Sequence, residues 1–293
     1  MKYYTVRNKV MPWGSYGAML WQGVYCFDKD SASHIVFRTG PFCPSIYRSQ
    51  YNRERPVLIV KDDTLQHIRE ANLTGFEIQP VNKGKIVKLD WENWDLQSPE
   101  PLIYPSGNMD AEEYIKRRKH SEATSEQIGE LFALTPQTDG LLYCEQERSS
   151  AKLVEQSLSG LDIFIDRIYC NSCAEIYVSE KAKDVLSEYF PGVLVFQDVP
   201  TFVADENLMR QLEQTAECKE YRKQREAEMT KSDWQSWFRL KDDARKLIEG
   251  LSLLKTESAK SKRKLNINNK LNSANEIYPL DYENWMREYW NKE

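Results

Sequence analysis

The strongest pattern in the chain is a buried apolar run, a capped amphipathic stretch and a second apolar run. Residues 57–60 (VLIV) are continuously apolar, which predicts a buried strand. Asp62 or Asp63 can cap a helix that follows, because either carboxylate can accept a free N–H of the first turn, and Gly75 supplies the backbone freedom needed after the helix. The helix is expected to bury one face, made of Leu65, Ile68 and Leu73.

The same pattern occurs a second time downstream. Residues 174–178 predict a strand, Ser179 is the expected cap, and Pro191 with Gly192 ends the helix. The residues expected to face inward are Ala182, Val185, Leu186 and Tyr189. The first strand residue and the glycine are 18 positions apart in both copies (75 − 57 and 192 − 174). An internal duplication explains this match, and so does one local solution used twice.

A hairpin is predicted after the first copy. Its arms are residues 76–81 and 85–91, and the glycine-containing turn is 82–84 (NKG). Alternation gives the second arm an inward face of Val87, Leu89 and Trp91 and an outward face of Ile86, Lys88, Asp90 and Glu92. Trp91 is therefore expected in the core, and the two carboxylates are expected at the surface.

The other elements of this part of the chain are predicted less directly. The first 55 residues are rich in Tyr, Gly and Ser and indicate short strands and loops. The prolines and glycine of residues 96–109 predict a loop. Helices are predicted over 110–119 and 121–134, and residues 137–160 are expected to be a connection. A strand over 161–168 can pair with the strand at 174–178.

The composition changes at residue 205. Residues 205–254 are polar, charged and free of proline, which predicts helices. Residues 255–270 are basic and poor in apolar side chains, which predicts a mobile linker before an aromatic, acidic tail. We therefore predict an α+β fold over 1–204, with a mixed or antiparallel sheet and flanking helices built around the two strand–helix–strand units. A helical C-terminal region is predicted over 205–293.

Charge and hydropathy narrow the function classes. The formal net charge of −5 and the pI near 5.5 disfavour a general nucleic-acid binder and suit a protein that meets a basic partner. The N-terminal residues lack the apolar stretch of a signal peptide. No apolar run approaches the roughly 20 residues that span a bilayer. A cytoplasmic location without membrane contact is expected.

Residue types suited to catalysis are sparse. The chain has no P-loop, GxGxxG, HExxH or GxSxG motif. The three histidines stand far apart, at His34, His67 and His120. We expect no catalytic set, cofactor or metal. Cys170 and Cys173 form a single CxxC without a second ligand pair, so reduced structural thiols are expected, and a zinc site or redox chemistry stays open.

One aromatic and acidic word occurs twice, as LDWENW at 89–94 and LDYENW at 280–285. Large aromatics beside carboxylates are typical of a surface that binds a partner, and core packing is the alternative. The candidate interface residues are Asp90, Glu92, Trp94, Asp281, Tyr282, Glu283, Trp285, Tyr289 and Trp290. A second pair, Trp234 and Trp237, shares one helix face, where core packing and partner binding are both open.

Residues 72–95, NLTGFEIQPVNKGKIVKLDWENWD, resemble bacterial immunity proteins of polymorphic toxin systems. The similar features are the turn and strand "LTGFE…PV" and the strand "KIV.L.WE.WD". Further similar stretches are GP at 40–41 with IYR at 46–48, EP at 100–101 with YP at 104–105, and IYVSEKAK at 176–183. The resemblance covers about residues 38–199, and neither the region from 205 onward nor the CxxC belongs to it.

The resemblance implies a cytoplasmic antitoxin for interbacterial competition. Such a protein binds one cognate toxin domain, often delivered through a contact-dependent or type VI secretion route, and protects by covering the toxin. Many such toxin domains are basic, which suits an acidic binder. Two other functions stay open. One is an enzyme of unrecognised type that reverses a toxin's modification, which needs a cleft where carboxylates meet His67 or His120. The other is an adaptor of a secretion locus.

Overall fold

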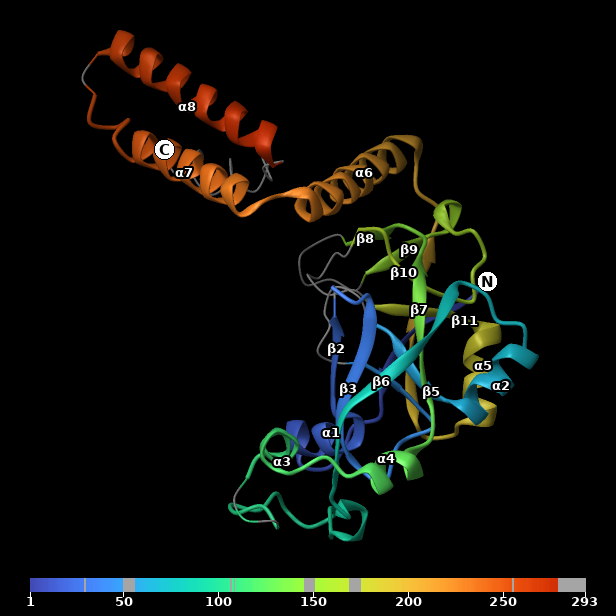
Figure 1. Ribbon diagram of the computed structural model, residues 1–293. Coiled ribbons are helices and arrows are strands. Elements are labelled where there is room, and N and C mark those ends of the chain that lie inside the picture. Colours follow the sequence, from blue (N-terminus) through green and yellow to red (C-terminus); the bar gives the residue numbers. More distant parts are fainter. Residues whose placement is uncertain are drawn as a thin grey trace. The chain divides into compact units, whose positions relative to one another are not determined.

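The computed structural model describes residues 1–28, 30–49, 56–105, 107, 109–144, 151–168, 175–254 and 256–278 (Figure 1). The chain divides into two compact units, 1–213 and 214–293. About 43% of the residues are helical and 26% are in strands, which confirms the predicted α+β class. Among the described residues, no helix combines the length and apolarity that a bilayer crossing requires.

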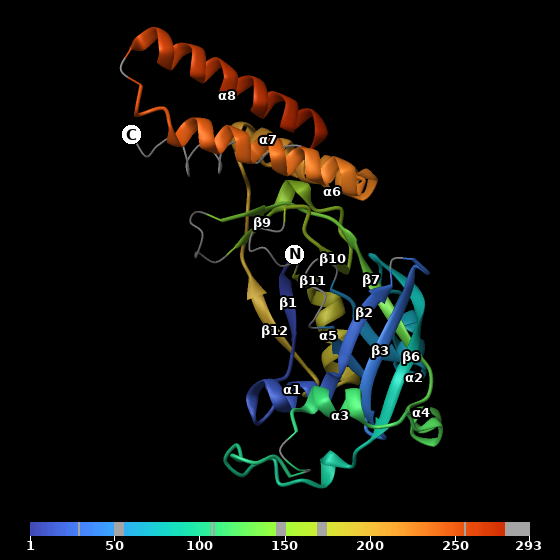
Figure 2. The same ribbon diagram turned by 60° about the vertical axis from the view of Figure 1, so that its left-hand side comes forward.

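A mixed sheet of ten strands forms the centre of the first unit (Figures 1 and 2). Its strands are β1 Tyr3–Asn8, β2 Val24–Asp28, β3 Ser33–Gly40, β4 Ile46–Arg48, β5 Leu58–Lys61, β6 Phe76–Lys88, β7 Leu131–Thr138, β10 Ile163–Ile165, β11 Ile176–Ser179 and β12 Leu194–Val199. The main path runs β12-β1-β11-β10-β7-β6-β3-β2, and β5 pairs with both β4 and β7. A smaller sheet contains β8 Leu142–Tyr143, β9 Lys152–Val154 and β13 Thr201–Phe202.

Helices cover this sheet and lie at its ends. The α-helices of the first unit are α1 Gly14–Gln22, α2 Asp62–Glu70, α3 Ala111–Arg117, α4 Glu122–Ile128 and α5 Glu180–Tyr189. Two short 3-10 turns are η1 Trp91–Asn93 and η2 Glu155–Ser157. Helix α6 Glu206–Glu228 crosses the division between the units, and α7 Lys231–Glu249 and α8 Glu257–Ile277 belong to the second unit.

The two strand–helix–strand patterns have the same topology as well as the same spacing. In the first, β5 and β6 are parallel because β7 lies between them and pairs antiparallel with both. In the second, β11 and β12 are parallel because β1 lies between them and pairs antiparallel with both. Each pattern is therefore a split β-α-β unit, with the strand between its parallel strands supplied from elsewhere in the chain.

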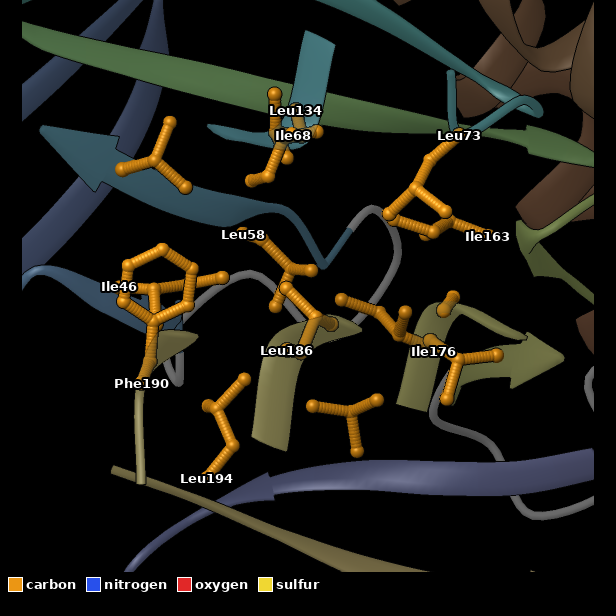
Figure 3. Close-up of a cluster of buried hydrophobic side chains, with 14 of the residues drawn as sticks. Ile46, Leu58, Ile68, Leu73, Leu134, Ile163, Ile176, Leu186, Phe190 and Leu194 are labelled. Atoms are coloured by element: carbon orange, nitrogen blue, oxygen red, sulfur yellow. The ribbon is translucent and has the colours of Figure 1, made fainter. Parts of the chain in front are cut away.

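Helices α2 and α5 of the two split β-α-β units contribute to one buried cluster (Figure 3). Leu58 and Ile68 come from β5 and α2, while Ile176 and Leu186 come from β11 and α5. All four are 0% exposed. Burial of aliphatic surface is the main favourable term in folding, so this shared cluster makes one core of the two split β-α-β units.

The predicted cap of the second pattern is confirmed, whereas in the first pattern neither Asp62 nor Asp63 takes the cap position. Ser179 accepts a hydrogen bond from the backbone N–H of Ala182. In the first pattern, β5 ends at Lys61, and Lys61 takes the cap position of α2 without a side-chain cap bond. Asp62 and Asp63 lie inside the first turn instead, where their charges are favourable at the positive end of the helix dipole. The Asp63 carboxylate still accepts a first-turn N–H, that of Thr64, over 2.7 Å.

The inward faces of α2 and α5 follow the sequence pattern with one exception. Leu65, Ile68, Ala182 and Leu186 are fully buried. Tyr189 was expected inward but is 45% exposed, because its ring stacks on the outer surface against His67, with ring centroids 4.6 Å apart.

The predicted hairpin after α2 is wrong, because β6 is one strand of 13 residues. It pairs antiparallel with β7 at its start and parallel with β3 further on. Gly84 lies in that second part, at a bulge where Val36 and Phe37 of β3 are opposite Lys83 and Lys85. A Cβ at Gly84 would lie 2.8 Å from side-chain atoms of both Ile35 and Phe37. The glycine therefore permits close packing at a bulge and does not form a turn.

Strand β6 also corrects the predicted outward face. Trp91, just beyond the strand, is buried as predicted, and Asp90 and Glu92 are exposed. Ile86 was expected outward but is 0% exposed, because it packs in a buried cluster with Ile128 of α4 on the other side of the sheet. Simple alternation fails where both faces of a strand are covered.

Three other predictions in the first unit need correction. Helix α1 lies within the first 55 residues, where strands and loops were predicted. The predicted helix over 121–134 ends at Ile128, and Gly129, with a φ of 77°, turns the chain into β7. The 137–160 connection contains β8 and β9. The predicted pairing of the strand within 161–168 with the following strand is confirmed as β10–β11.

The second unit is helical, and α8 overturns the predicted linker over 255–270. Thr256 caps α8 by accepting a hydrogen bond from the N–H of Ala259. The buried positions of α8 recur at helical spacing, and they are Ile267, Leu271 and Ala274. They pack with Trp237 of α7, whose indole N–H also donates to the carbonyl of Tyr278 over 3.1 Å. The core interpretation of Trp237 is therefore confirmed.

Candidate partner-binding surface

The first copy of the repeated word is anchored by a cluster of buried aromatic side chains. Strand β6 ends at Lys88, and Leu89 and Trp91 then turn into the core. They pack with buried residues of α1, α3 and the loop before α1, which include Met11, Trp13, Tyr16, Met19, Leu20, Trp21, Ala111 and Tyr114. We call these ten residues the aromatic base. Because aromatic rings bury large areas, the base fixes the start of the following loop.

Ring contacts extend the base toward the surface. The ring of Phe42 meets that of Trp91 edge-on at 5.2 Å between centroids, and it lies 5.2 Å from Trp21. Trp94, a predicted interface residue, is half-buried, with its ring 6.4 Å from that of Trp13. Trp94 is therefore partly packed against the base and partly open to solvent.

The residues from 89 to 110 carry all the excess charge of the chain. They include five carboxylates and neither Lys nor Arg, and the carboxylates are Asp90, Glu92, Asp95, Glu100 and Asp110. The resulting charge of −5 equals the formal net charge of the whole chain. All five carboxylate residues are exposed. We call residues 89–110 the acidic segment; Figures 1 and 2 show it beside α1 and α3, at the end of the sheet away from β8 and β9.

A hydrogen bond attaches the acidic segment to the base, and others order the segment itself. The indole N–H of Trp13 donates to the carbonyl of Ser98 over 3.0 Å. Asp95 stabilises the first turn, because its carboxylate accepts from the N–H of Gln97 and its carbonyl accepts from the hydroxyl of Ser98. These bonds leave the other carboxylates of the segment facing solvent.

The acidic segment exposes two aliphatic side chains, at residues 102 and 103. Leu102 is 101% exposed and Ile103 is 66% exposed. We call this pair the apolar tip. Two residues that flank the tip are bonded to each other, because the hydroxyl of Tyr104 donates a 2.8 Å hydrogen bond to the carboxylate of Glu100. The ring of Tyr104 stacks on that of Tyr16, with centroids 3.7 Å apart and an interplanar angle of 9°.

The sequence interpretation reached Asp90, Glu92 and Trp94 but missed the rest of this surface. Residues 96–109 were predicted only as a loop. Two signals were present: five carboxylates over residues 89–110 without any Lys or Arg, and the pair Leu102-Ile103 between Pro101 and Pro105. A core interpretation of the two aliphatic residues was the natural one, and only their exposure in the structure excludes it.

The second copy of the word lies outside the described residues. The predicted interface residues concerned are Asp281, Tyr282, Glu283, Trp285, Tyr289 and Trp290. Cys170 and Cys173 also lie outside them. In the described part of the chain, Cys26, Cys43 and Cys144 are free thiols, and no group of three or more His, Cys, Asp or Glu side chains is arranged to bind a metal.

Each histidine contacts groups close to it in the fold. His34 is buried between the hydroxyl of Tyr25, at 2.8 Å, and the amide of Gln79, and burial lowers its pKa although the bond to Gln79 opposes this. His120 accepts from the N–H of Ile86 through Nδ1, and its Nε2 lies 3.0 Å from Glu122. These contacts connect neighbouring elements of the fold.

Comparison with known proteins gives no relative. No protein-family model matches the sequence, no curated protein is similar to it, and no solved structure matches the fold. The resemblance of residues 72–95 to immunity proteins therefore rests on the residue pattern alone.

Proposed function

We propose that this chain is an immunity protein, which binds one cognate toxin domain of a bacterial polymorphic toxin system and neutralises it by covering its functional surface. It would act in the cytoplasm, at one molecule per toxin molecule, against a toxin delivered by a neighbouring cell. The observation that carries the proposal is the acidic segment, where all the excess negative charge lies beside exposed aliphatic side chains on a fixed aromatic base.

The charge of the acidic segment suits a basic partner. Five exposed carboxylates within 22 residues (110 − 89 + 1) create a local negative potential that speeds the approach of a basic domain and orients it. The attraction is long-range, and it weakens as salt shortens the screening length to about 10 Å at 0.1 M. Steering of this kind suits an antitoxin, which must capture its toxin before the toxin acts.

The anchoring of the segment favours tight binding. Trp91 and Tyr16 are buried, and they fix its start and its tip through side-chain packing. A surface that is already ordered loses little conformational entropy on binding, so more of the contact energy appears as affinity. Neutralisation by occlusion needs only such a surface and no chemical step.

The sequence resemblance and the structural surface coincide in the chain. The stretch 72–95 runs from the turn after α2, through β6, into the start of the acidic segment. Its turn contains Gly75, which has a φ of 92°, and a Cβ added there would lie 2.3 Å from the carbonyl oxygen of Ile163. Its final residues, WENWD at 91–95, begin with the buried Trp91 and continue into the first residues of the exposed surface.

The test is a titration against the toxin domain encoded beside this protein's gene. The purified full-length chain is added to the active toxin domain, and toxin activity is measured against the ratio of the two. We expect complete inhibition at about one equivalent and a stable complex on size-exclusion chromatography. Full toxin activity at excess antitoxin would overturn the proposal.

Two other results would identify the alternatives. Protection at far less than one equivalent would indicate an enzyme that reverses the toxin's modification. A stable complex that leaves the toxin fully active would indicate an adaptor of the secretion locus. Occlusion makes a further prediction. A catalytically inactive toxin variant, added to the mixture, should bind the protein and so release the active toxin from inhibition.

A further inference from the structure

The apolar tip is exposed at the point where the loop is closed. Leu102 is 101% exposed and Ile103 is 66% exposed. The residues on either side of them, Glu100 and Tyr104, are joined by a 2.8 Å hydrogen bond. Tyr104 is also stacked on Tyr16 of α1, which is 3% exposed. The two aliphatic side chains therefore project from a closed turn whose base is attached to the core.

Prolines restrict the backbone around the tip. Pro99, Pro101 and Pro105 fix their own φ angles and limit the residues before them to extended conformations. A chain with fewer accessible conformations loses less entropy when it is immobilised by a partner. The turn therefore presents the tip in a form that is already suited to insertion.

The position of the tip within the acidic segment defines the chemistry of its partner. Carboxylates occur before and after it, at Asp95, Glu100 and Asp110, and all three residues are exposed. A partner that receives the two aliphatic side chains must also accommodate this negative charge. The same charge is repelled by the anionic surface of a bacterial or cytoplasmic membrane leaflet, which leaves a basic protein surface as the matching partner.

We infer that Leu102 and Ile103 are the anchor by which the protein binds its partner, and that the partner is a basic protein domain with an apolar pocket rimmed by Lys or Arg. The inference rests on the proposed function and specifies its contact. Carboxylates steer the encounter and the tip retains the complex, because burying an aliphatic side chain strengthens binding by roughly tenfold or more. Loss of the tip should therefore raise the dissociation rate, and loss of the carboxylates should lower the association rate.

The experiment compares two variants of the full-length chain with the wild type. The probe is the purified toxin domain encoded beside the gene, in a catalytically inactive form, and binding is measured by surface plasmon resonance at about 50 and about 300 mM NaCl. The test variant carries Leu102→Ser and Ile103→Ser. The control is Leu253→Ser, which removes an aliphatic side chain that is 79% exposed in the turn after α7.

We expect the double variant to bind about 100-fold more weakly, almost entirely through faster dissociation and with an unchanged salt dependence. The control should match the wild type within about twofold. All three proteins should unfold at the same temperature, since the altered side chains are exposed.

The outcomes separate the two claims. If the wild type binds and inhibits the toxin while the double variant binds within about threefold of it, the anchor is wrong and the proposed function stands. An equal loss in the Leu253→Ser control also overturns the anchor. If the wild type does not bind the toxin domain, the proposed function fails, and the anchor fails with it.

Discussion

The carboxylate of Asp162 accepts a 2.7 Å hydrogen bond from the hydroxyl of Ser179. Its other oxygen accepts from the backbone N–H of Thr74 over 3.1 Å and from the Thr74 hydroxyl over 3.2 Å. Ser179 caps α5, and Thr74 lies in the turn after α2. One side chain, only 7% exposed as a residue, therefore joins the two split β-α-β units, from the N-terminus of α5 to the turn that follows the C-terminus of α2.

Asp162→Asn should destabilise the protein by about 2–3 kcal/mol at neutral pH, because charge-assisted hydrogen bonds are lost in a buried place. Burial acts to raise the pKa of Asp162, but the bonds from Ser179, Thr74 and Lys181 outweigh it and lower the pKa below 3.8. A lowered pKa gives stability that is present above the unfolded value and is lost as the pH falls through the folded one.

Urea unfolding of both proteins at about pH 7 and about pH 3 checks this prediction. The difference between wild type and variant should shrink at the lower pH, because the carboxylate takes up a proton in the unfolded chain at a higher pH than in the folded protein. Asp110→Asn serves as the control, because Asp110 is exposed, and it should cost little at either pH. An equal difference at both pH values would contradict the assignment.

Two glycines should respond to alanine by different amounts. A Cβ at Gly17 in α1 would lie 1.9 Å from the backbone oxygen of Pro12, whereas one at Gly84 would meet the side chains of Ile35 and Phe37 at 2.8 Å. Side chains can shift and backbone cannot do so cheaply. We expect Gly84→Ala to cost about 1–3 kcal/mol and Gly17→Ala to cost more, measured by urea unfolding. The reverse order would show that the loop before α1 yields more easily than the bulge.

Arg38 supports the aromatic base through the backbone. Its guanidinium is fully buried, and it donates to the carbonyls of Trp21 (3.0 Å), Phe42 (3.1 Å) and Thr39 (3.2 Å). Arg38→Met leaves these carbonyls without a donor, and we expect a loss of about 3 kcal/mol or more. Arg38→Lys should recover only part of it, because one ammonium cannot reproduce the planar fork.

Hydrogen exchange of residues 89–110 gives a second measure of the Arg38 variants. If the base fixes the acidic segment, amides there should exchange faster in Arg38→Met than in the wild type, while amides of α7 and α8 in the second unit stay unchanged. Unchanged exchange in the segment, together with reduced stability, would show that Arg38 supports the core but not the binding surface.

Tyr104→Phe tests the closed turn beneath the apolar tip. The variant keeps the ring that stacks on Tyr16 but loses the hydroxyl bonded to Glu100. We expect a change in stability below about 1 kcal/mol, since the bond is at the surface, and about threefold to tenfold weaker binding to the toxin domain. Tyr143→Phe is a suitable control, because the Tyr143 ring packs on Phe202 of the small sheet.

That hydrogen bond also has a spectroscopic consequence. Bonding to Glu100 raises the pKa of Tyr104, because the phenolate cannot donate to the carboxylate. In an alkaline titration of tyrosine absorbance, the Glu100→Gln variant should therefore show one tyrosine ionising at lower pH than in the wild type. An identical titration curve would contradict the bond in solution.

Local signals in the sequence predicted the parts of the fold that depend on local chemistry. Ser179 caps α5 because its short hydroxyl side chain, placed just before the helix, can accept a free N–H of the first turn. Gly75 has a φ of 92°, as its position after α2 requires. The apolar runs of β5 and β11 are buried strands. In each case the deciding contacts lie within a few residues of one another.

The errors arose where distant contacts decide. The turn signal around Gly84 is overridden by pairing with β3, and β7 is a strand because β5 and β6 pair with it on either side. Helix α8 has few apolar residues, but three at the right spacing suffice when α7 covers them. For the candidate surface, the charge pattern can be read from the sequence, whereas the exposure of Leu102 and Ile103 depends on where the loop is attached to the fold.

The position of β1 sets the order in which this protein can be completed during synthesis. Residues 3–8 leave the ribosome before the other strands of the first unit, yet both of their neighbours in the sheet, β11 and β12, are among the last strands of that unit to emerge. Until residues 176–179 are available, both edges of β1 lack their partner strands, and one edge still lacks its partner until residue 199 is available. The protein therefore cannot finish its sheet strand by strand as it emerges, and folding of the first unit must wait for nearly its whole length.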